Sequence, residues 1–168
     1  MIIPEIKKIL YATDLSENAR YCFGYAASLA NRYGASIAIL HVLEIRKGYT
    51  YDLSTYLGAE KWEDIRKSHE EESINTIRTR LATFCEDAAA EDNTCSFNVE
   101  DVVVKRGNPA EEILRHAESE EFDMVVMGTH GHDAIADVMM GSTARRVLRR
   151  CKKPVLVVRL PENEGLEN

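Results

Sequence analysis

Short runs of aliphatic residues alternate along this chain with longer segments whose apolar positions recur at helical spacing. The run Ser36–Leu43 is apolar at nearly every position, as expected of a strand that is buried on both faces of a sheet. Strands that alternate with helices are typical of an α/β protein with a parallel sheet. The predicted strands are Ile6–Thr13, Ser36–Leu43, Val99–Lys105, Phe122–Met127 and Pro154–Arg159.

Residues that favour helix ends separate these strands. Ser16 is a candidate N-cap for the first helix, and Gly34 follows its last turn. Asn108 and Pro109 have the residue types preferred at the N-cap and at the first position of a later helix. The predicted helices are Glu17–Tyr33, Glu60–Ala90, Pro109–Ser119 and Thr143–Cys151.

Length and composition fit one domain with a sizeable core. The chain has 168 residues, of which 45% are hydrophobic, and we expect a single domain over residues 1–160 and an acidic tail over residues 161–168. The net charge of −7 argues against binding to nucleic acid or to anionic lipid, because such affinity depends on cationic side chains. The four cysteines form no Cys-x-x-Cys pair, which predicts a reducing compartment and no zinc site. Because no apolar run is long enough to cross a bilayer, we expect a soluble, cytoplasmic protein without membrane contact.

The segment Gly128–Thr143 carries the most specific chemical pattern in the chain. It contains Gly128, Gly131 and Gly141 in the spacing Gly-x2-Gly-x9-Gly-Ser, between a predicted strand and a predicted helix. Glycines there can adopt backbone angles closed to other residues and can let main-chain N–H groups approach an anion at the helix start. The pattern therefore predicts a phosphate-binding loop, although it matches neither the Walker loop nor the dinucleotide fingerprint.

This loop resembles that of the universal stress protein family, in its ATP-binding branch. Ile9–Ser16 is similar to the family's first strand and adenosine-contacting turn, and Lys153–Val158 is similar to its closing strand. The resemblance covers nearly the whole chain and implies an open, doubly wound, parallel five-stranded sheet in the order 3-2-1-4-5, with helices on both faces. In that order the first and fourth strands meet where the winding reverses, which is where such sheets bind ligands.

The predicted nucleotide site combines the ends of these two strands. Asp14 suits the hydroxyl groups of a ribose, whereas the alternative is an Asx-type turn before the first helix. The resemblance implies that the backbone of Val42 contacts adenine and that Met127 lines the same pocket, while Ala12 stands where many ATP-binding relatives have proline. The predicted site residues are Ala12, Thr13, Asp14, Val42, Met127, Gly128, Thr129, His130, Gly131, His132, Gly141, Ser142 and Thr143.

Two groups of residues leave alternatives open. The six basic residues between Arg145 and Lys153 either form a solvated helix face or include one arginine that reaches an ATP phosphate. His130, His132 and Asp133 are metal-ligand types without a diagnostic spacing. We therefore expect no dedicated metal site, and expect Mg²⁺ or Mn²⁺ to accompany the phosphates of ATP.

The leading hypothesis is an ATP-binding stress-response protein that acts as a nucleotide-dependent switch towards an unknown protein partner. The alternatives are a weak ATPase and a nucleotide-independent dimeric interaction module, and no catalytic residues are assigned because no nucleophile and base stand out. Family resemblance implies a homodimer through Pro154–Leu160, whose exposed apolar edge would otherwise favour aggregation. The segment Glu44–Lys61 is too long for a simple connector, so we expect it to form a flexible flap near the adenosine side of the site. The fluorescence of Trp62, which lies just past it, should report closure of this flap.

Overall fold

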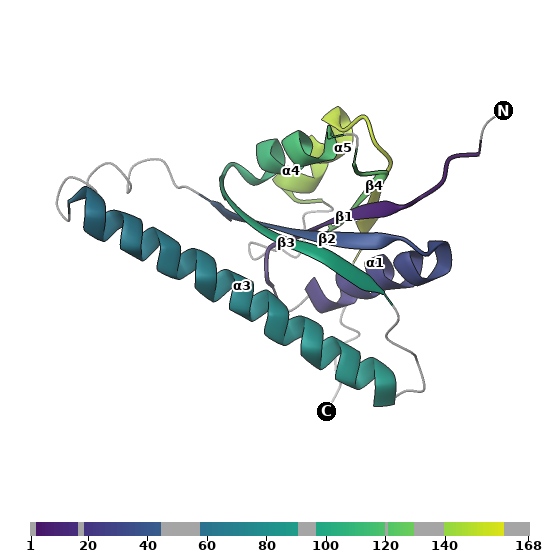
Figure 1. Ribbon diagram of the computed structural model, residues 1–168. Coiled ribbons are helices and arrows are strands. Elements are labelled where there is room, and N and C mark those ends of the chain that lie inside the picture. Colours follow the sequence, from purple (N-terminus) through teal and green to yellow (C-terminus); the bar gives the residue numbers. More distant parts are fainter. Residues whose placement is uncertain are drawn as a thin grey trace, which may run out of the picture.

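Five parallel strands form the centre of the molecule. The computed structural model describes residues 3–16, 19–44, 58–90, 97–119, 121–129 and 140–159. The sheet has the order β3-β2-β1-β4-β5, which confirms the predicted topology (Figure 1). The strands are β1 (Lys8–Thr13), β2 (Ser36–Glu44), β3 (Asn98–Gly107), β4 (Met124–Gly128) and β5 (Val155–Val158).

Helices cover both faces of this sheet, as predicted. Helices α4 and α5 lie on one face, and α1 and α3 lie on the other (Figure 1). The helices are α1 (Ala19–Tyr33), α3 (Ala59–Ala90), α4 (Pro109–Ala117) and α5 (Ser142–Arg150). Among the described residues, no helix has both the length and the apolar character needed to cross a membrane.

Local signals explain where several elements begin and end. Gly34 has a φ of 66°, and Ala35 N donates to Ala30 O at 2.9 Å, which closes the last turn of α1. At the start of α4, the side chain of Asn108 accepts a hydrogen bond from Glu111 N at 3.2 Å, so its predicted role as N-cap is confirmed. At Ser16, the predicted N-cap of the first helix, the backbone carbonyl accepts a bond from Ala19 N at 3.0 Å. Residues 17 and 18 lie outside the described residues, so the side-chain cap stays a prediction.

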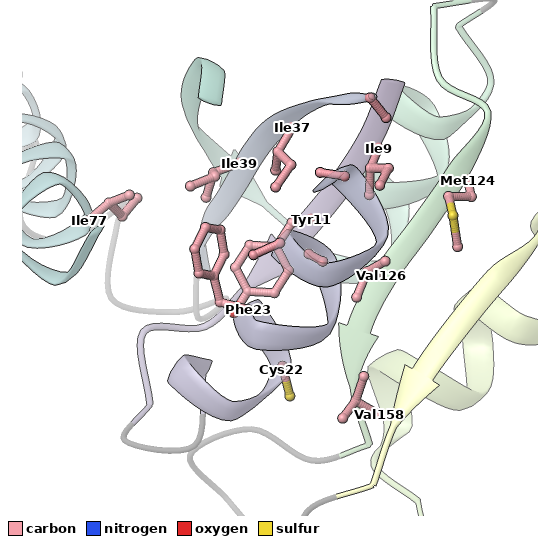
Figure 2. Packing of buried hydrophobic residues seen from close by; sticks show 14 of the residues in the cluster. Ile9, Tyr11, Cys22, Phe23, Ile37, Ile39, Ile77, Met124, Val126 and Val158 are labelled. Carbon is pink, nitrogen blue, oxygen red and sulfur yellow. The ribbon is translucent and has the colours of Figure 1, made fainter. Parts of the chain in front are cut away.

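The core on the α1 and α3 face contains packed aromatic rings. Figure 2 shows Tyr11 of β1 beside Phe23 of α1, and their ring centroids are 5.4 Å apart. Phe23 also meets Phe84 at 5.1 Å and Phe97 at 5.3 Å in edge-to-face geometry. Edge-to-face pairs stabilise a core beyond their buried area, so these rings fix α1 and α3 against the end of β1.

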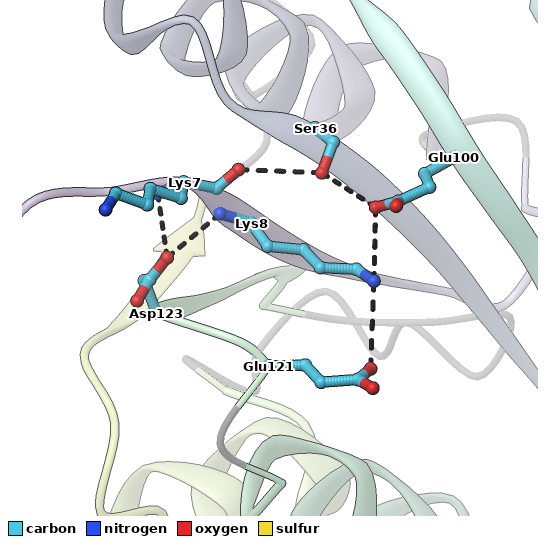
Figure 3. Close-up of polar contacts among 6 residues, drawn as sticks. All are labelled: Lys7, Lys8, Ser36, Glu100, Glu121 and Asp123. Atoms are coloured by element: carbon cyan, nitrogen blue, oxygen red, sulfur yellow. Dashed lines mark hydrogen bonds and ion pairs between the residues drawn. The ribbon is translucent and has the colours of Figure 1, made fainter.

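Polar side chains connect the strands at their amino ends. Asp123, just before β4, accepts bonds from the backbone N–H groups of Lys7 at 2.7 Å and Lys8 at 2.9 Å (Figure 3). The Lys8 ammonium lies 3.1 Å from a carboxylate oxygen of Glu100 and 3.7 Å from one of Glu121, and its hydrogen bond holds the pKa of Glu100 below the usual range. These contacts align the neighbouring strands at the edge of the sheet opposite to the candidate site.

Candidate functional site

The carboxyl ends of β1 and β4 lie side by side, as the predicted strand order requires. Ala12 of β1 is the register partner of Met127 of β4. Thr13, the last residue of β1, is the partner of His41 on β2. Residues that are more than a hundred positions apart in sequence therefore meet at one edge, at the point where the winding of the sheet reverses.

A cavity of about 690 Å³ opens at this edge. Its volume falls within the range of ordinary small-molecule sites. Ten of the thirteen predicted site residues line it: Ala12, Thr13, Asp14, Val42, Met127, Gly128, Thr129, Gly141, Ser142 and Thr143. The other three, His130, Gly131 and His132, lie outside the described residues.

The turn after β1 is built from its own side chains. Thr13 Oγ1 accepts a bond from Leu15 N at 3.2 Å, and Asp14 Oδ1 accepts one from Ser16 N at 3.1 Å. The second bond is the Asx-type turn foreseen as the alternative role of Asp14. A carboxylate has acceptor sites on two oxygens, so this bond is compatible with a second role towards a ligand. Leu15 adopts a φ of 63°, the left-handed region that residues other than glycine rarely occupy.

His41 is a cavity residue that the sequence reasoning did not select. Its side chain is only 7% exposed, and its Nδ1 lies 2.9 Å from the carbonyl oxygen of Thr13. Because a carbonyl only accepts, Nδ1 carries the proton and donates. The signal was a polar residue within the otherwise apolar strand Ser36–Leu43.

Other lining residues were also missed. Pro109 and Ile113 line the cavity because α4 begins where β3 ends, at the same edge of the sheet. Applying the strand-end rule to the third strand as well as to the first and fourth would have found them. The missed lining residues are Leu15, Leu40, His41, Leu43, Glu44, Pro109, Ile113 and Ala144.

The amino end of α5 points its first turn towards the cavity. Ser142, Thr143 and Ala144 are the first residues of α5 and line the cavity, and the first N–H groups of a helix have no partner within the helix. They give this wall a positive electrostatic character that suits an anion. Apolar residues such as Val42 and Met127 line other parts of the same cavity.

Gly128 and Gly141 of the predicted phosphate-binding loop have ordinary backbone angles, contrary to the expectation for glycines in such a loop. Gly141 has φ −63° and ψ 158°, angles open to any residue, and its N–H donates to Thr129 O at 2.8 Å. Gly128 is the last residue of β4, and the described glycines with positive φ are Gly34, Gly58 and Gly107. The expectation that Gly128 uses backbone angles closed to other residues is therefore wrong, because the strand ladder keeps it extended. The Gly141–Thr129 bond instead joins the two ends of the loop.

Two arginines of α5 have a structural role. Arg150 and Arg146 both approach the carboxylate of Glu111 at the start of α4, Arg146 at 3.9 Å. This supports the solvated-face interpretation for these two residues. In the part of the chain that the structure describes, no three His, Cys, Asp or Glu side chains are grouped as metal ligands, and the cluster His130–Asp133 lies outside that part.

The predicted flap falls largely outside the described residues. Glu44 is the last residue of β2, and α3 already begins at Ala59, so the connection is shorter at both ends than expected. Residues 45–57 are not among those described. The flap over the adenosine therefore stays a prediction.

The fold and the cavity define a doubly wound α/β protein with a cavity at its topological switch point. The model of the universal stress protein family matches residues 5–159, and the chain belongs to this family. It is 32% identical to universal stress protein MJ0577 of Methanocaldococcus jannaschii over 91% of this chain and 94% of that protein. It is 30% identical to a universal stress protein of Thermus aquaticus, over 91% of this chain and 98% of the relative.

Solved structures agree with this assignment. The structure of MJ0577 superposes with a TM-score of 0.74 at 28% identity, covering 95% of this chain and all of that one. Universal stress protein UspA from Lactobacillus plantarum also gives a TM-score of 0.74, at 22% identity and over 94% of this chain. The second likeness supports the fold alone.

Proposed function

We propose that this chain binds ATP in the cavity at the carboxyl ends of β1 and β4 and acts as a nucleotide-dependent switch in the stress response. The observation that carries the proposal is the meeting of three chemically different walls around one cavity. These walls are the Asp14 turn, the apolar pair Val42 and Met127, and the start of α5 at Ser142. They correspond in chemistry to a ribose, an adenine base and a chain of phosphates.

The polarity of the cavity supports one direction for the proposed nucleotide. A carboxylate at Asp14 repels phosphate and accepts bonds from ribose hydroxyls, whereas the start of α5 attracts anions. The base therefore lies towards Val42 and the phosphates towards Ser142 and Thr143, with Mg²⁺ or Mn²⁺ bound to the phosphates. A universal stress protein of the same fold has been solved in complex with cAMP, so AMP and cAMP are the ligands to compare with ATP.

The test begins with mass spectrometry of nucleotide released from freshly purified protein. Calorimetric titration with ATP, AMP and cAMP, each with and without Mg²⁺, then ranks the ligands. We expect ATP with Mg²⁺ to bind most tightly. Equal affinity for AMP would remove contacts of the β- and γ-phosphates with α5 from the proposal. Release of ADP on incubation would identify the alternative, a weak ATPase.

Asp14→Asn tests the ribose contact without removing the turn. Asparagine keeps the side-chain oxygen that accepts the bond from Ser16 N, but loses the charge. We expect ATP affinity to fall by about tenfold or more, because a hydrogen bond to a charged group contributes about 1.5–3 kcal/mol. The unmodified protein should also discriminate against 2′-deoxy-ATP or 3′-deoxy-ATP, whereas Asp14→Asn should discriminate less. Equal discrimination by both proteins would exclude Asp14 as the ribose ligand.

The dimer through Pro154–Leu160 is part of the same proposal. β5 is the edge strand of the sheet, and Val155, Leu156 and Val157 are only partly buried. An apolar strand at an open edge favours pairing with another strand. A second copy of this chain is the partner that we propose for it.

A further inference from the structure

Arg80 of α3 contacts the turn that carries Asp14. Its Nη1 donates to the carbonyl oxygen of Leu15 at 2.6 Å and to that of Ser16 at 3.1 Å. The turn immediately follows β1, whereas Arg80 lies more than sixty residues later in sequence. One cationic side chain on the α3 face of the sheet thus binds two consecutive carbonyls beside the candidate nucleotide site.

The conformation of this turn requires support from outside. Leu15 holds a left-handed φ of 63°, which an L-residue keeps only when its surroundings fix it. The orientation of the Asp14 side chain depends on that conformation, because its Oδ1 accepts a bond from Ser16 N within the turn. His41 holds the Thr13 carbonyl from β2, and Arg80 holds the two carbonyls that follow Asp14.

The turn also separates two cavities. Thr13 and Leu15 line the 690 Å³ cavity and, in addition, a second cavity of about 220 Å³ on the other face of the sheet. The second cavity is bounded by α3 through Ile77, Arg80 and Phe84. A movement of the turn on nucleotide binding would therefore change the surroundings of α3 directly.

We infer that Arg80 is a positioning residue for the nucleotide site. It holds the turn Thr13–Ser16 in the conformation that presents Asp14, and it couples occupancy of the site to the packing of α3. This inference rests on the proposed function, because the nucleotide whose affinity Arg80 affects is the one proposed there. Coupling between two sites is reciprocal, so α3 affects nucleotide affinity and the nucleotide affects α3 to the same extent.

The experiment compares Arg80→Gln with the matched control Arg78→Gln. Arg78 is exposed on the same helix, and two residues along a helix place it on a different face from Arg80. Hydrogen exchange of the nucleotide-free proteins is measured first, at the amides of Leu15 and Ser16. We expect exchange at these amides to be faster in Arg80→Gln and unchanged in Arg78→Gln, with circular dichroism as the control for folding.

Binding of ATP is measured next on the same proteins. We expect Arg80→Gln to lower affinity by about fivefold or more, the lower end of typical coupling between sites. ATP should slow exchange in α3 near Ile77 and Phe84 in the unmodified protein and in Arg78→Gln, but not in Arg80→Gln. Arg80→Lys should recover part of the affinity, because lysine keeps the charge without the planar fork.

The outcomes separate the two proposals. Unchanged exchange at Leu15 and Ser16 in Arg80→Gln would show that Arg80 does not hold the turn. Faster exchange with unchanged ATP affinity would overturn the positioning role while leaving the nucleotide site intact. An unmodified protein that binds no adenine nucleotide would overturn the proposed function and the coupling with it, and exchange in the nucleotide-free proteins would still decide whether Arg80 holds the turn.

Discussion

Gly141→Val is the sharpest perturbation of the proposed phosphate site. Gly141 is the N-cap of α5, with φ −63° and ψ 158°, and its carbonyl accepts a bond from Arg145 N at 3.1 Å. Valine adopts these angles without strain, so the fold is retained. The cost to stability is limited to the poorer N-cap propensity of valine, about 1 kcal/mol.

In Gly141→Val the free energy of ATP binding should fall much more than the free energy of unfolding. Gly141 is the N-cap of α5 and lines the cavity together with Ser142 and Thr143, so we expect a branched side chain there to compete with phosphate oxygens for the space at the first N–H groups of α5. Loss of two charge-assisted hydrogen bonds costs about 3–6 kcal/mol at about 1.5–3 kcal/mol each, which is a loss of about a hundredfold or more in affinity. Ser142→Ala removes one hydroxyl and leaves the backbone donors, so it should cost about tenfold or less.

The assay is calorimetric titration of ATP into the two variants and the unmodified protein. Circular dichroism and thermal unfolding provide the control for folding. A folded Gly141→Val protein with nearly unchanged affinity for ATP would exclude the start of α5 as the phosphate site.

Other predictions address stability and assembly. Gly24→Ala should stabilise the protein by up to about 1 kcal/mol, measured by urea denaturation, because Gly24 lies inside α1 and, among the described residues, an added Cβ would meet only the Phe84 ring edge at 4.0 Å. Burial raises the pKa of the Cys22 thiol from 9.0 to about 11. The unfolded state then loses its proton first as pH rises, so stability should fall between pH 9 and 11 by about 2–3 kcal/mol more than in Cys22→Ala; equal pH profiles would contradict this. Asp123→Ala should destabilise by about 1–3 kcal/mol in denaturation, since it leaves two backbone N–H groups without their carboxylate. Analytical ultracentrifugation should give a dimer at micromolar concentration, and a monomer mass at every concentration would exclude pairing through Pro154–Leu160.

Helix and strand boundaries were predictable because their causes are local. Each observed boundary lies within two residues of the predicted one. The cap at Asn108 needs only a bond to Glu111 N three residues later, and the end of α1 needs only a glycine at position 34 with positive φ. Such features depend on neighbours in sequence, so residue types alone reveal them.

The strand order required more than local pattern. Alternation of strands and helices indicated a parallel sheet, but family resemblance selected the order 3-2-1-4-5. Once that order was assumed, the rule that ligands bind at strand ends near the switch point brought Asp14 and Gly128 together, although they lie far apart in the chain. Ser142 was found differently, from the glycine spacing of the loop before the last helix.

The support of the turn around Asp14 could not be predicted, because it depends on contacts between distant parts of the chain. His41 and Arg80 reach its carbonyls from β2 and α3, and no periodicity or spacing places an arginine of one helix beside a turn some sixty residues earlier. The same applies to Gly141, whose ordinary φ and bond to Thr129 O contradict the usual reason for a glycine. Residue types along the chain were enough to predict the helices, the strands and the chemistry at their ends, because these depend on local propensity and apolar pattern. Packing decided which side chains meet across the chain, because that depends on where α3 and α5 come to lie on the sheet.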